Sequence, residues 1–153
     1  MWLHVSSGSG PPGAGKTSVS SAIEQMGCRA ISIGNLAREY CRQDARAKYC
    51  QTIRHSQMVG AAEGAAVSAK LLKREIKKAL HADQDGSCFV VDGFPRSALH
   101  LIEWAKENMG KYVAVAGLIG LELDEAAARS RVLSRDGDGR LDDNEAVFTE
   151  RMK

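Results

Sequence analysis

The stretch with the clearest chemistry runs from residue 10 to residue 17 and reads GPPGAGKT. It matches the pattern G-x-x-x-x-G-K-[ST], whose glycines let successive backbone N–H groups turn toward phosphate oxygens. Lys16 can reach the β- and γ-phosphates of a nucleotide, and the hydroxyl of Thr17 can ligate Mg²⁺. A Gly-rich turn that merely precedes a helix is the alternative. The complete motif, followed at once by a helical pattern, favours phosphate binding.

Arginine is the second residue type with phosphate chemistry, because its guanidinium stays charged and its planar fork holds two oxygens at once. Phosphoryl transfer brings two polyanions together, so catalysis is mostly positioning and cationic stabilisation. Any single arginine is better explained as a solvated surface residue. The candidates for this chemistry are Arg38, Arg96, Arg131, Arg135, Arg140 and Arg151.

Strands and helices alternate along the chain. After the phosphate motif, Val19, Ala22, Ile23 and Met26 repeat at helical spacing, and Gly27 is placed to end that helix. Residues 30–33 (AISI) and 88–92 (CFVVD) are short apolar runs typical of buried parallel strands, and residues 112–123 supply a further strand. Residues 6–9 (SSGS) precede the motif where a buried central strand is expected, so that strand is either short and strained or atypical.

The remaining segments are helical. The pattern is helical from Leu36 to about His81, and a helix with Trp104 on its core stripe ends at Gly110. Asp124 is predicted to cap a last helix. Lysines and an arginine fill one face of the 65–79 stretch, where a solvated helix face is favoured over a binding patch. Together these elements predict an α/β fold with a parallel sheet.

Composition narrows the class of protein. The chain has 153 residues, 44% of them apolar and 26% charged, which is typical of one globular domain. Its net charge of +2 is too small to indicate nucleic acid or an anionic membrane as the main partner. No apolar run approaches the ~18 residues of a membrane span. The four cysteines lack zinc spacing, which favours buried reduced thiols in a cytoplasmic protein.

Three further segments, together with the phosphate motif, resemble the nucleoside monophosphate kinases, which include adenylate kinase and UMP-CMP kinase. The segments are residues 91–96 (VDGFPR), residues 32–38 (SIGNLAR) and residues 139–145 (GRLDDNE) followed by Arg151. The resemblance extends from about Val5 to Lys153. It implies a three-layer αβα fold with a P-loop, a core of residues 1–34, 65–135 and 143–153, a monophosphate-binding segment at 35–64 and a short lid at 136–142. Six arginines at the family's motif positions are poorly explained as surface residues.

The resemblance also implies roles for individual residues. ATP with Mg²⁺ would be held by Gly13, Ala14, Gly15, Lys16, Thr17, Ser18, Arg131 and Arg135, with Asp92 orienting a metal-bound water. The acceptor monophosphate would be held by Ile33, Arg38, Gln57, Met58, Val59, Gly93, Phe94, Pro95, Arg96, His100, Arg140 and Arg151. The residues expected to act in catalysis are Lys16, Arg96, Arg135, Arg140 and Arg151. No protein-bound metal beyond the nucleotide's own Mg²⁺ is expected, and the protein is expected to be a monomer.

Several positions depart from the family pattern. His100 stands where the family reads the acceptor base with Gln or Asn, so both AMP and UMP or CMP stay open as acceptors. An exposed helix residue is the alternative for His100. The family's last strand has no counterpart before Lys153, so four strands are expected instead of five. A truncated or degenerate nucleotide-binding protein without turnover therefore remains an alternative. A P-loop GTPase is disfavoured because no Asn-Lys-x-Asp segment is present.

Overall fold

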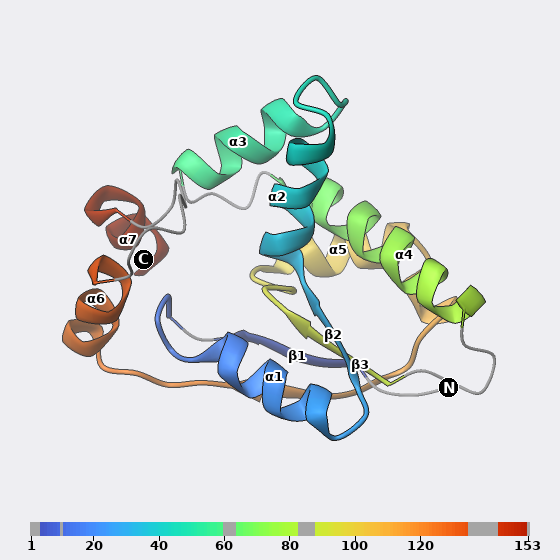
Figure 1. The fold of residues 1–153 in the computed structure, drawn as a ribbon, viewed down its shortest axis with the longest axis horizontal. Helices are drawn as coiled ribbons and strands as arrows, with labels where there is room; N and C mark the ends of the chain where they lie inside the picture. The colour runs from blue at the N-terminus through green and yellow to red at the C-terminus, as the bar shows by residue number, and fades with distance from the viewer. Residues whose placement is uncertain (1–3, 10, 60–63, 83–87, 135–143, 153) are drawn as a thin grey trace.

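A computed structural model describes residues 4–9, 11–59, 64–82, 88–134 and 144–152 (Figure 1). Within these ranges four strands form one parallel sheet in the order β2-β3-β1-β4. They are β1 (His4–Ser9), β2 (Arg29–Ser32), β3 (Phe89–Asp92) and β4 (Val115–Gly120). The expected α/β fold with a parallel sheet is thereby confirmed.

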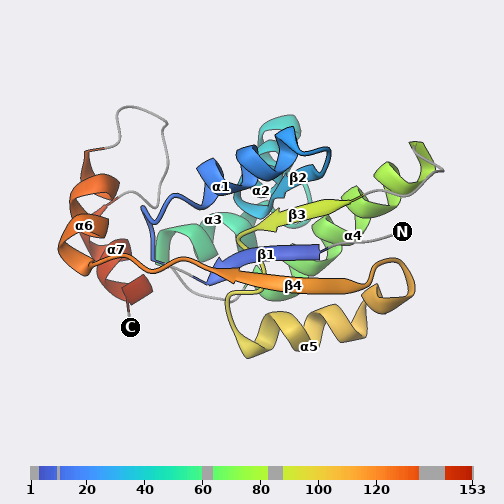
Figure 2. The ribbon, with the colours of Figure 1, turned by 90° about the horizontal axis from the view of Figure 1, so that it is seen from below.

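Helices cover both faces of this sheet. Helix α1 (Lys16–Gln25) lies on one face, against β1, β2 and β3. Helices α4 (Ala65–Ala82) and α5 (Ala98–Lys106) contact each other on the opposite face (Figure 2). The other helices are α2 (Ile33–Gln43), α3 (Cys50–Val59), α6 (Glu125–Leu133), α7 (Glu145–Met152) and the short 3₁₀ helix η2 (Met109–Lys111).

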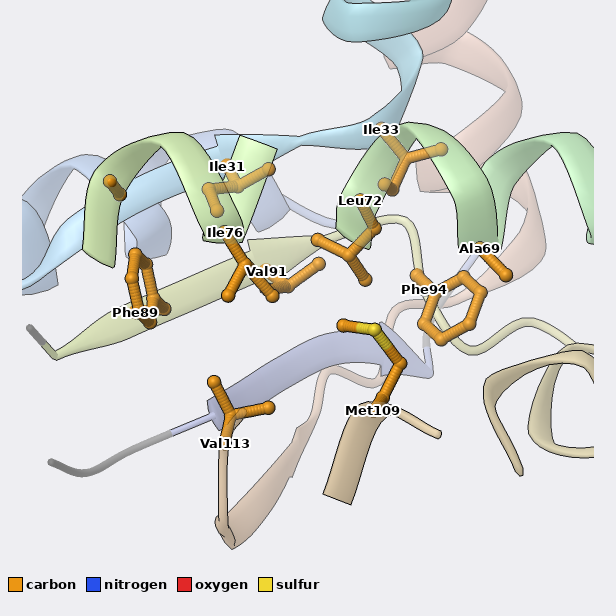
Figure 3. Close-up of a cluster of buried hydrophobic side chains, with 11 residues drawn as sticks. Ile31, Ile33, Ala69, Leu72, Ile76, Phe89, Val91, Phe94, Met109 and Val113 are labelled. Carbon is orange, nitrogen blue, oxygen red and sulfur yellow. The ribbon is translucent and has the colours of Figure 1, made fainter. Parts of the chain in front are cut away.

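The main hydrophobic core lies between the sheet and α4. Ile76 and Leu72 of α4 meet Val91 of β3, and all three side chains are at most 1% exposed (Figure 3). Met109 and Phe94 close the same cluster. Trp104 packs against it as a partly buried side chain, as expected from its place on the helical stripe. Burial of these apolar groups is what holds β3, and therefore the loop that follows it, in a fixed place.

The strand before the phosphate motif forms despite its serines and glycine. β1 lies between β3 and β4 and pairs with both, so it is a central strand. Its pairing with β4 is irregular between His4 and Val5 and again between Ser6 and Ser9. The irregular register accompanies a sequence rich in serine and glycine, which are residue types with low strand propensity.

Four sequence-based expectations about local structure need correction. Ile33 begins helix α2 and does not end a strand, because Ser32 is the N-cap and its hydroxyl accepts a hydrogen bond from the backbone N–H of Asn35. The helical stretch 36–81 is interrupted, since residues 44–49 connect α2 to α3. The expected strand 112–123 shortens to β4. Met26 is 82% exposed, so the apolar stripe of α1 does not continue into the core.

The expectation that all four cysteines are reduced is wrong. Cys28 and Cys88 form a disulfide, with Cα atoms 4.5 Å apart, at the starts of β2 and β3. Parallel pairing of these strands brings together two residues that are separated by 60 positions in the sequence. Cys41 and Cys50 remain free thiols, and burial together with the neighbouring Cys50 raises the pKa of Cys41 to about 12. The Cys41 thiol is therefore protonated and a poor nucleophile at neutral pH.

None of the helices in the described part of the chain is long and apolar enough to cross a lipid bilayer. The proposed boundaries at residues 34/35, 64/65, 135/136 and 142/143 stay predictions. Of the expected lid, residues 136–142 lie outside the described residues.

Candidate functional site

The phosphate motif forms a loop between β1 and α1. Gly13 and Gly15 adopt positive φ values of 83° and 86°, and Gly15 is the N-cap of α1. Because glycine has no side chain, no side-chain cap occupies the first N–H groups of α1. The ammonium of Lys16 donates to the carbonyl of Pro11 at 2.7 Å, which holds the cation over the loop. A loop and helix end of this kind carry positive potential toward a bound anion.

Helix α6 packs directly against this loop. A Cβ atom added at Gly13 would lie 3.0 Å from the carbonyl oxygen of Ala128 and 3.3 Å from the Cβ of Arg131. Arg131 also donates from its Nη1 to the Gly13 carbonyl at 3.4 Å. Position 13 thus requires glycine for two reasons: its φ is positive, and α6 leaves no room for a side chain. This contact brings Arg131 to the phosphate loop across 118 residues of sequence.

One cavity of about 1100 Å³ extends from the phosphate loop to helices α2, α3 and α4, and we refer to it as the cleft. Its size is sufficient for small-molecule ligands. Helices α3 and α7 contact each other beside it. Among the residues expected from the sequence, the cleft is lined by Gly13, Ala14, Gly15, Lys16, Thr17, Ser18, Ile33, Arg38, Gln57, Asp92, Gly93, Arg96, His100 and Arg131.

The carboxyl end of β3 supplies three of these residues. Asp92 is the last residue of the strand, and Gly93 follows it with a φ of 84°. Arg96 folds back so that its Nε donates to the Gly93 carbonyl at 3.0 Å. A Cβ atom at Gly93 would lie 3.0 Å from Nη2 of Arg96, so glycine leaves room for the guanidinium. Ligands of open parallel sheets bind at this edge, beyond the carboxyl ends of the strands.

A second guanidinium enters the cleft from α2. Arg38 donates from Nη2 to Oδ1 of Asn35, one turn earlier in the same helix. Its guanidinium lies near Gly34, where an added Cβ would be 3.5 Å from Nη1. Ile33, which is 4% exposed, anchors the start of α2 in the main core. The core thus positions the start of α2, and with it a cation that lines the cleft.

His100 is buried at the wall of the cleft, with only 4% of its surface exposed. The alternative that it is an exposed helix residue is therefore wrong. Its Nδ1 lies 3.1 Å from the hydroxyl of Ser97, and its ring packs edge-on against Phe94 with centroids 5.0 Å apart. Burial, aided by the nearby charge of Arg96, lowers the pKa of His100 to about 4. At neutral pH the imidazole is therefore uncharged, with one nitrogen as donor and the other as acceptor.

Some expected site residues do not line the cleft or cannot be placed there. Met58 is 62% exposed and is not part of the lining. Phe94 is buried in the core, and Pro95 follows it through a cis peptide bond, so both support the loop after β3 from outside the cleft. Arg135 and Arg140 lie outside the described residues. Val59 and Arg151 belong to α3 and α7, but their side chains lie outside the described part of the structure.

Two acidic residues of the lining were missed by the sequence analysis. Glu122 follows the carboxyl end of β4, and Glu150 comes from α7. The signal for Glu122 was present in the sequence, since polar residues that follow parallel strands face the ligand edge of the sheet. For Glu150 no local signal exists, because only the packing of α7 brings it to the cleft.

The residues of the loop fit a nucleoside triphosphate with its Mg²⁺. The glycine backbone, the uncapped N-terminus of α1 and the Lys16 ammonium all provide positive charge or N–H donors for phosphate oxygens. Thr17, Ser18 and Asp92 line the same end of the cleft and offer hydroxyl and carboxylate oxygens, which are the ligand types that Mg²⁺ prefers.

Comparisons with known proteins agree with this chemistry. The sequence model of a family described as "AAA domain" matches residues 9–149. Human UMP-CMP kinase is 30% identical over 146 residues, which cover 94% of this chain and 74% of that protein. An adenylate kinase of Synechococcus sp. (strain CC9311) is 32% identical over 145 residues, covering 94% of this chain and 73% of the relative. UMP-CMP kinase 2 of Caenorhabditis elegans is also 32% identical over 145 residues.

Proposed function

Because the chain belongs to the nucleoside monophosphate kinase family, we propose that it transfers a phosphoryl group from ATP to a nucleoside monophosphate, giving the diphosphate and ADP. The observation that carries this proposal is that one cleft is lined both by the phosphate loop and by Arg38 and Arg96. Two polyanions can meet only where cations face both of them. A binding site for one nucleotide alone would need only one of the two groups.

The donor side of the cleft is assigned to ATP. Residues 13–18 would hold its phosphates through backbone N–H groups, and Lys16 would interact with the oxygens that gain charge during transfer. Mg²⁺ bound with the nucleotide supplies charge neutralisation, and Thr17 or Ser18 would hold it directly and Asp92 through water. Arg131, which donates to the Gly13 carbonyl, would contact the donor nucleotide.

The acceptor side is assigned to the monophosphate. Arg38 and Arg96 would clamp its phosphate, with Arg96 aimed by the Gly93 carbonyl and Arg38 by Asn35. Backbone atoms around Gln57 would contact the base, and His100 would present one donor or one acceptor to its edge. The family resemblance adds Arg135, Arg140 and Arg151 as groups that close over the transferring phosphoryl. Closure would exclude water, which otherwise would accept the phosphoryl group.

The acceptor base is left open between AMP and the pyrimidines UMP and CMP. The relatives include both UMP-CMP kinases and an adenylate kinase, at similar identity. A neutral histidine differs from the amide side chains expected at this position, because it offers one hydrogen-bonding nitrogen to the ligand once Ser97 occupies the other. We therefore expect weaker discrimination between bases than a site with paired hydrogen bonds would give.

A coupled assay with ATP and each of AMP, CMP, UMP and dCMP tests the proposal. We expect turnover with at least one acceptor, and we expect Lys16→Ala to lower kcat by about 10²–10³-fold because it removes charge that matters most in the transition state. Lys78→Ala, which removes a lysine from the exposed face of α4, is the matched control and should keep full activity. Retained ATP binding with no turnover of any acceptor would instead identify a nucleotide-binding protein without kinase activity.

A further inference from the structure

The two guanidiniums proposed for the acceptor lie just beyond the ends of two neighbouring strands. β2 and β3 pair in parallel up to their last residues. Gly34 follows β2 by two residues, and a Cβ atom built on it would lie 3.5 Å from Nη1 of Arg38. Gly93 follows β3 directly, and a Cβ atom built on it would lie 3.0 Å from Nη2 of Arg96. The relative position of the two guanidiniums therefore depends on how β2 and β3 are paired.

Apolar burial specifies the register of this strand pair only weakly. β3 reads FVVD, and its three apolar residues are at most 1% exposed, so the strand is buried on both faces. Within such a run, a shift of one residue exchanges one buried apolar side chain for another. The same shift moves one guanidinium relative to the other by about 3.3 Å, the rise of one strand residue. A charge-assisted contact to one phosphate does not survive such a displacement.

A covalent link lies at the opposite end of the same strand pair. Cys28 and Cys88 directly precede the first paired residues, and their disulfide holds the Cα atoms 4.5 Å apart. The backbone N–H of Arg29 donates to the carbonyl of Cys88 at 2.7 Å, so the pairing continues up to the bridge. A shift of one residue would turn the two Cβ atoms to opposite faces of the sheet, where no disulfide can form. The bridge is therefore compatible with the observed register and excludes the shifted one.

We propose that the Cys28–Cys88 bridge is a positioning element of the acceptor site. By fixing the register of β2 and β3, it holds Arg38 and Arg96 at the spacing that clamps one phosphate. This inference rests on the proposed function, which assigns these two arginines to the monophosphate. The phosphate loop follows β1, which the bridge does not join, and it lies at the end of α1 away from Cys28. The bridge thus acts on the binding of one substrate and leaves the other unchanged.

The test compares the bridged chain with two unbridged forms, the double variant Cys28→Ser/Cys88→Ser and the parent chain reduced with dithiothreitol. In the reduction each cysteine sulfur gains a hydrogen, and the reagent closes to its cyclic disulfide. Isothermal titration calorimetry measures the binding of AMP, CMP and UMP and, separately, of ATP. We expect the Kd of the monophosphate to rise by about tenfold or more in both unbridged forms, since small misplacements of positioning groups have large effects. The Kd of ATP should stay within about twofold.

Arg38→Ala shows whether the bridge acts through the two arginines. In the bridged chain it should weaken monophosphate binding by about 10–100-fold. In the Cys28→Ser/Cys88→Ser background the further loss should be several times smaller, because the clamp is already impaired there.

Met109→Ala is the control for lowered stability. It keeps the bridge and truncates a side chain of η2 that is 0% exposed, a change that destabilises about as much as loss of a disulfide. The variant should bind the monophosphate like the parent chain. Circular dichroism at the assay temperature checks that every form is folded.

Equal monophosphate Kd values in the bridged and unbridged forms, with turnover retained in the coupled assay, would overturn this inference and leave the proposed function intact. An equal loss of ATP binding, the same loss in Met109→Ala, or unfolding of both unbridged forms would also overturn it, since each indicates a general structural role. Additive losses for Arg38→Ala would place the effect of the bridge elsewhere. A bridged chain with neither turnover nor monophosphate binding would refute the proposed function, and this inference with it.

Discussion

Binding of the acceptor monophosphate should depend on Arg96. Its guanidinium is aimed by the Gly93 carbonyl and lines the cleft. We expect Arg96→Ala to raise the KM for the monophosphate by about 10–100-fold, because a charge-assisted contact to phosphate is lost. Steady-state kinetics with each substrate varied in turn measures this.

The KM for ATP should change much less in the same variant. Arg46→Ala removes an exposed arginine between α2 and α3 that does not line the cleft, and it controls for loss of overall charge. An unchanged KM and kcat for every acceptor in Arg96→Ala would remove Arg96 from the acceptor site.

His100 should make stability depend on pH. The native pKa of about 4 lies below the ordinary value of 6.5, so between these values the unfolded chain binds a proton that the native protein does not. The free energy of unfolding is therefore highest above pH 6.5. It falls by up to about 3 kcal/mol as the pH drops toward 4. Urea unfolding at pH 7.5 and pH 4.5 should show this loss in the parent and a smaller one in His100→Gln.

The same His100→Gln variant also reports on base choice. If His100 contacts the acceptor base, the ratio of kcat/KM for AMP and CMP should shift. If the kcat/KM ratio in His100→Gln equals that of the parent chain, His100 does not contact the base and is only a structural residue beside Phe94.

At the scale of elements, α6 is the helix that packs on the phosphate loop and would complete the proposed donor site. Oδ1 of Asp124 accepts from the N–H groups of Ala126 and Ala127, at 2.9 and 3.1 Å, and so caps the helix as the sequence predicted. Asp124→Ala should lower the free energy of unfolding by about 1 kcal/mol. Because α6 packs on Gly13, the KM for ATP should also rise. Asp124→Asn keeps a capping oxygen and should behave like the parent in urea unfolding and in kinetics.

At the scale of the whole molecule, the Cys28–Cys88 disulfide ties two neighbouring strands of the sheet. It closes a loop between residues separated by 60 positions, so it restricts the unfolded chain. We expect reduction, or the double change Cys28→Ser and Cys88→Ser, to lower the free energy of unfolding by about 2–4 kcal/mol. Urea unfolding with and without a thiol reductant measures this.

Cys41→Ser controls for the disulfide experiment, because Cys41 is a free thiol whose raised pKa keeps it unreactive. The variant should keep the sensitivity of the parent to reductant. Equal unfolding midpoints for the oxidised and reduced parent chain would show that the bridge does not stabilise the sheet.

Features that depend on residues near each other in the chain could be predicted from the sequence alone. The phosphate loop before α1, the cap at Asp124 and the alternation of strands and helices all follow from local spacing, because backbone conformation and hydrogen bonds over a few residues are set by those residues themselves. The resemblance to kinases also rested on short segments of this kind.

Only the tertiary structure decided which distant segments meet. The Cys28–Cys88 bridge, the contact of α6 with Gly13 and the burial of His100 join residues far apart in sequence or depend on what covers them. Local spacing carries no information on such distances, because packing of the whole core selects one arrangement among many with the same local patterns.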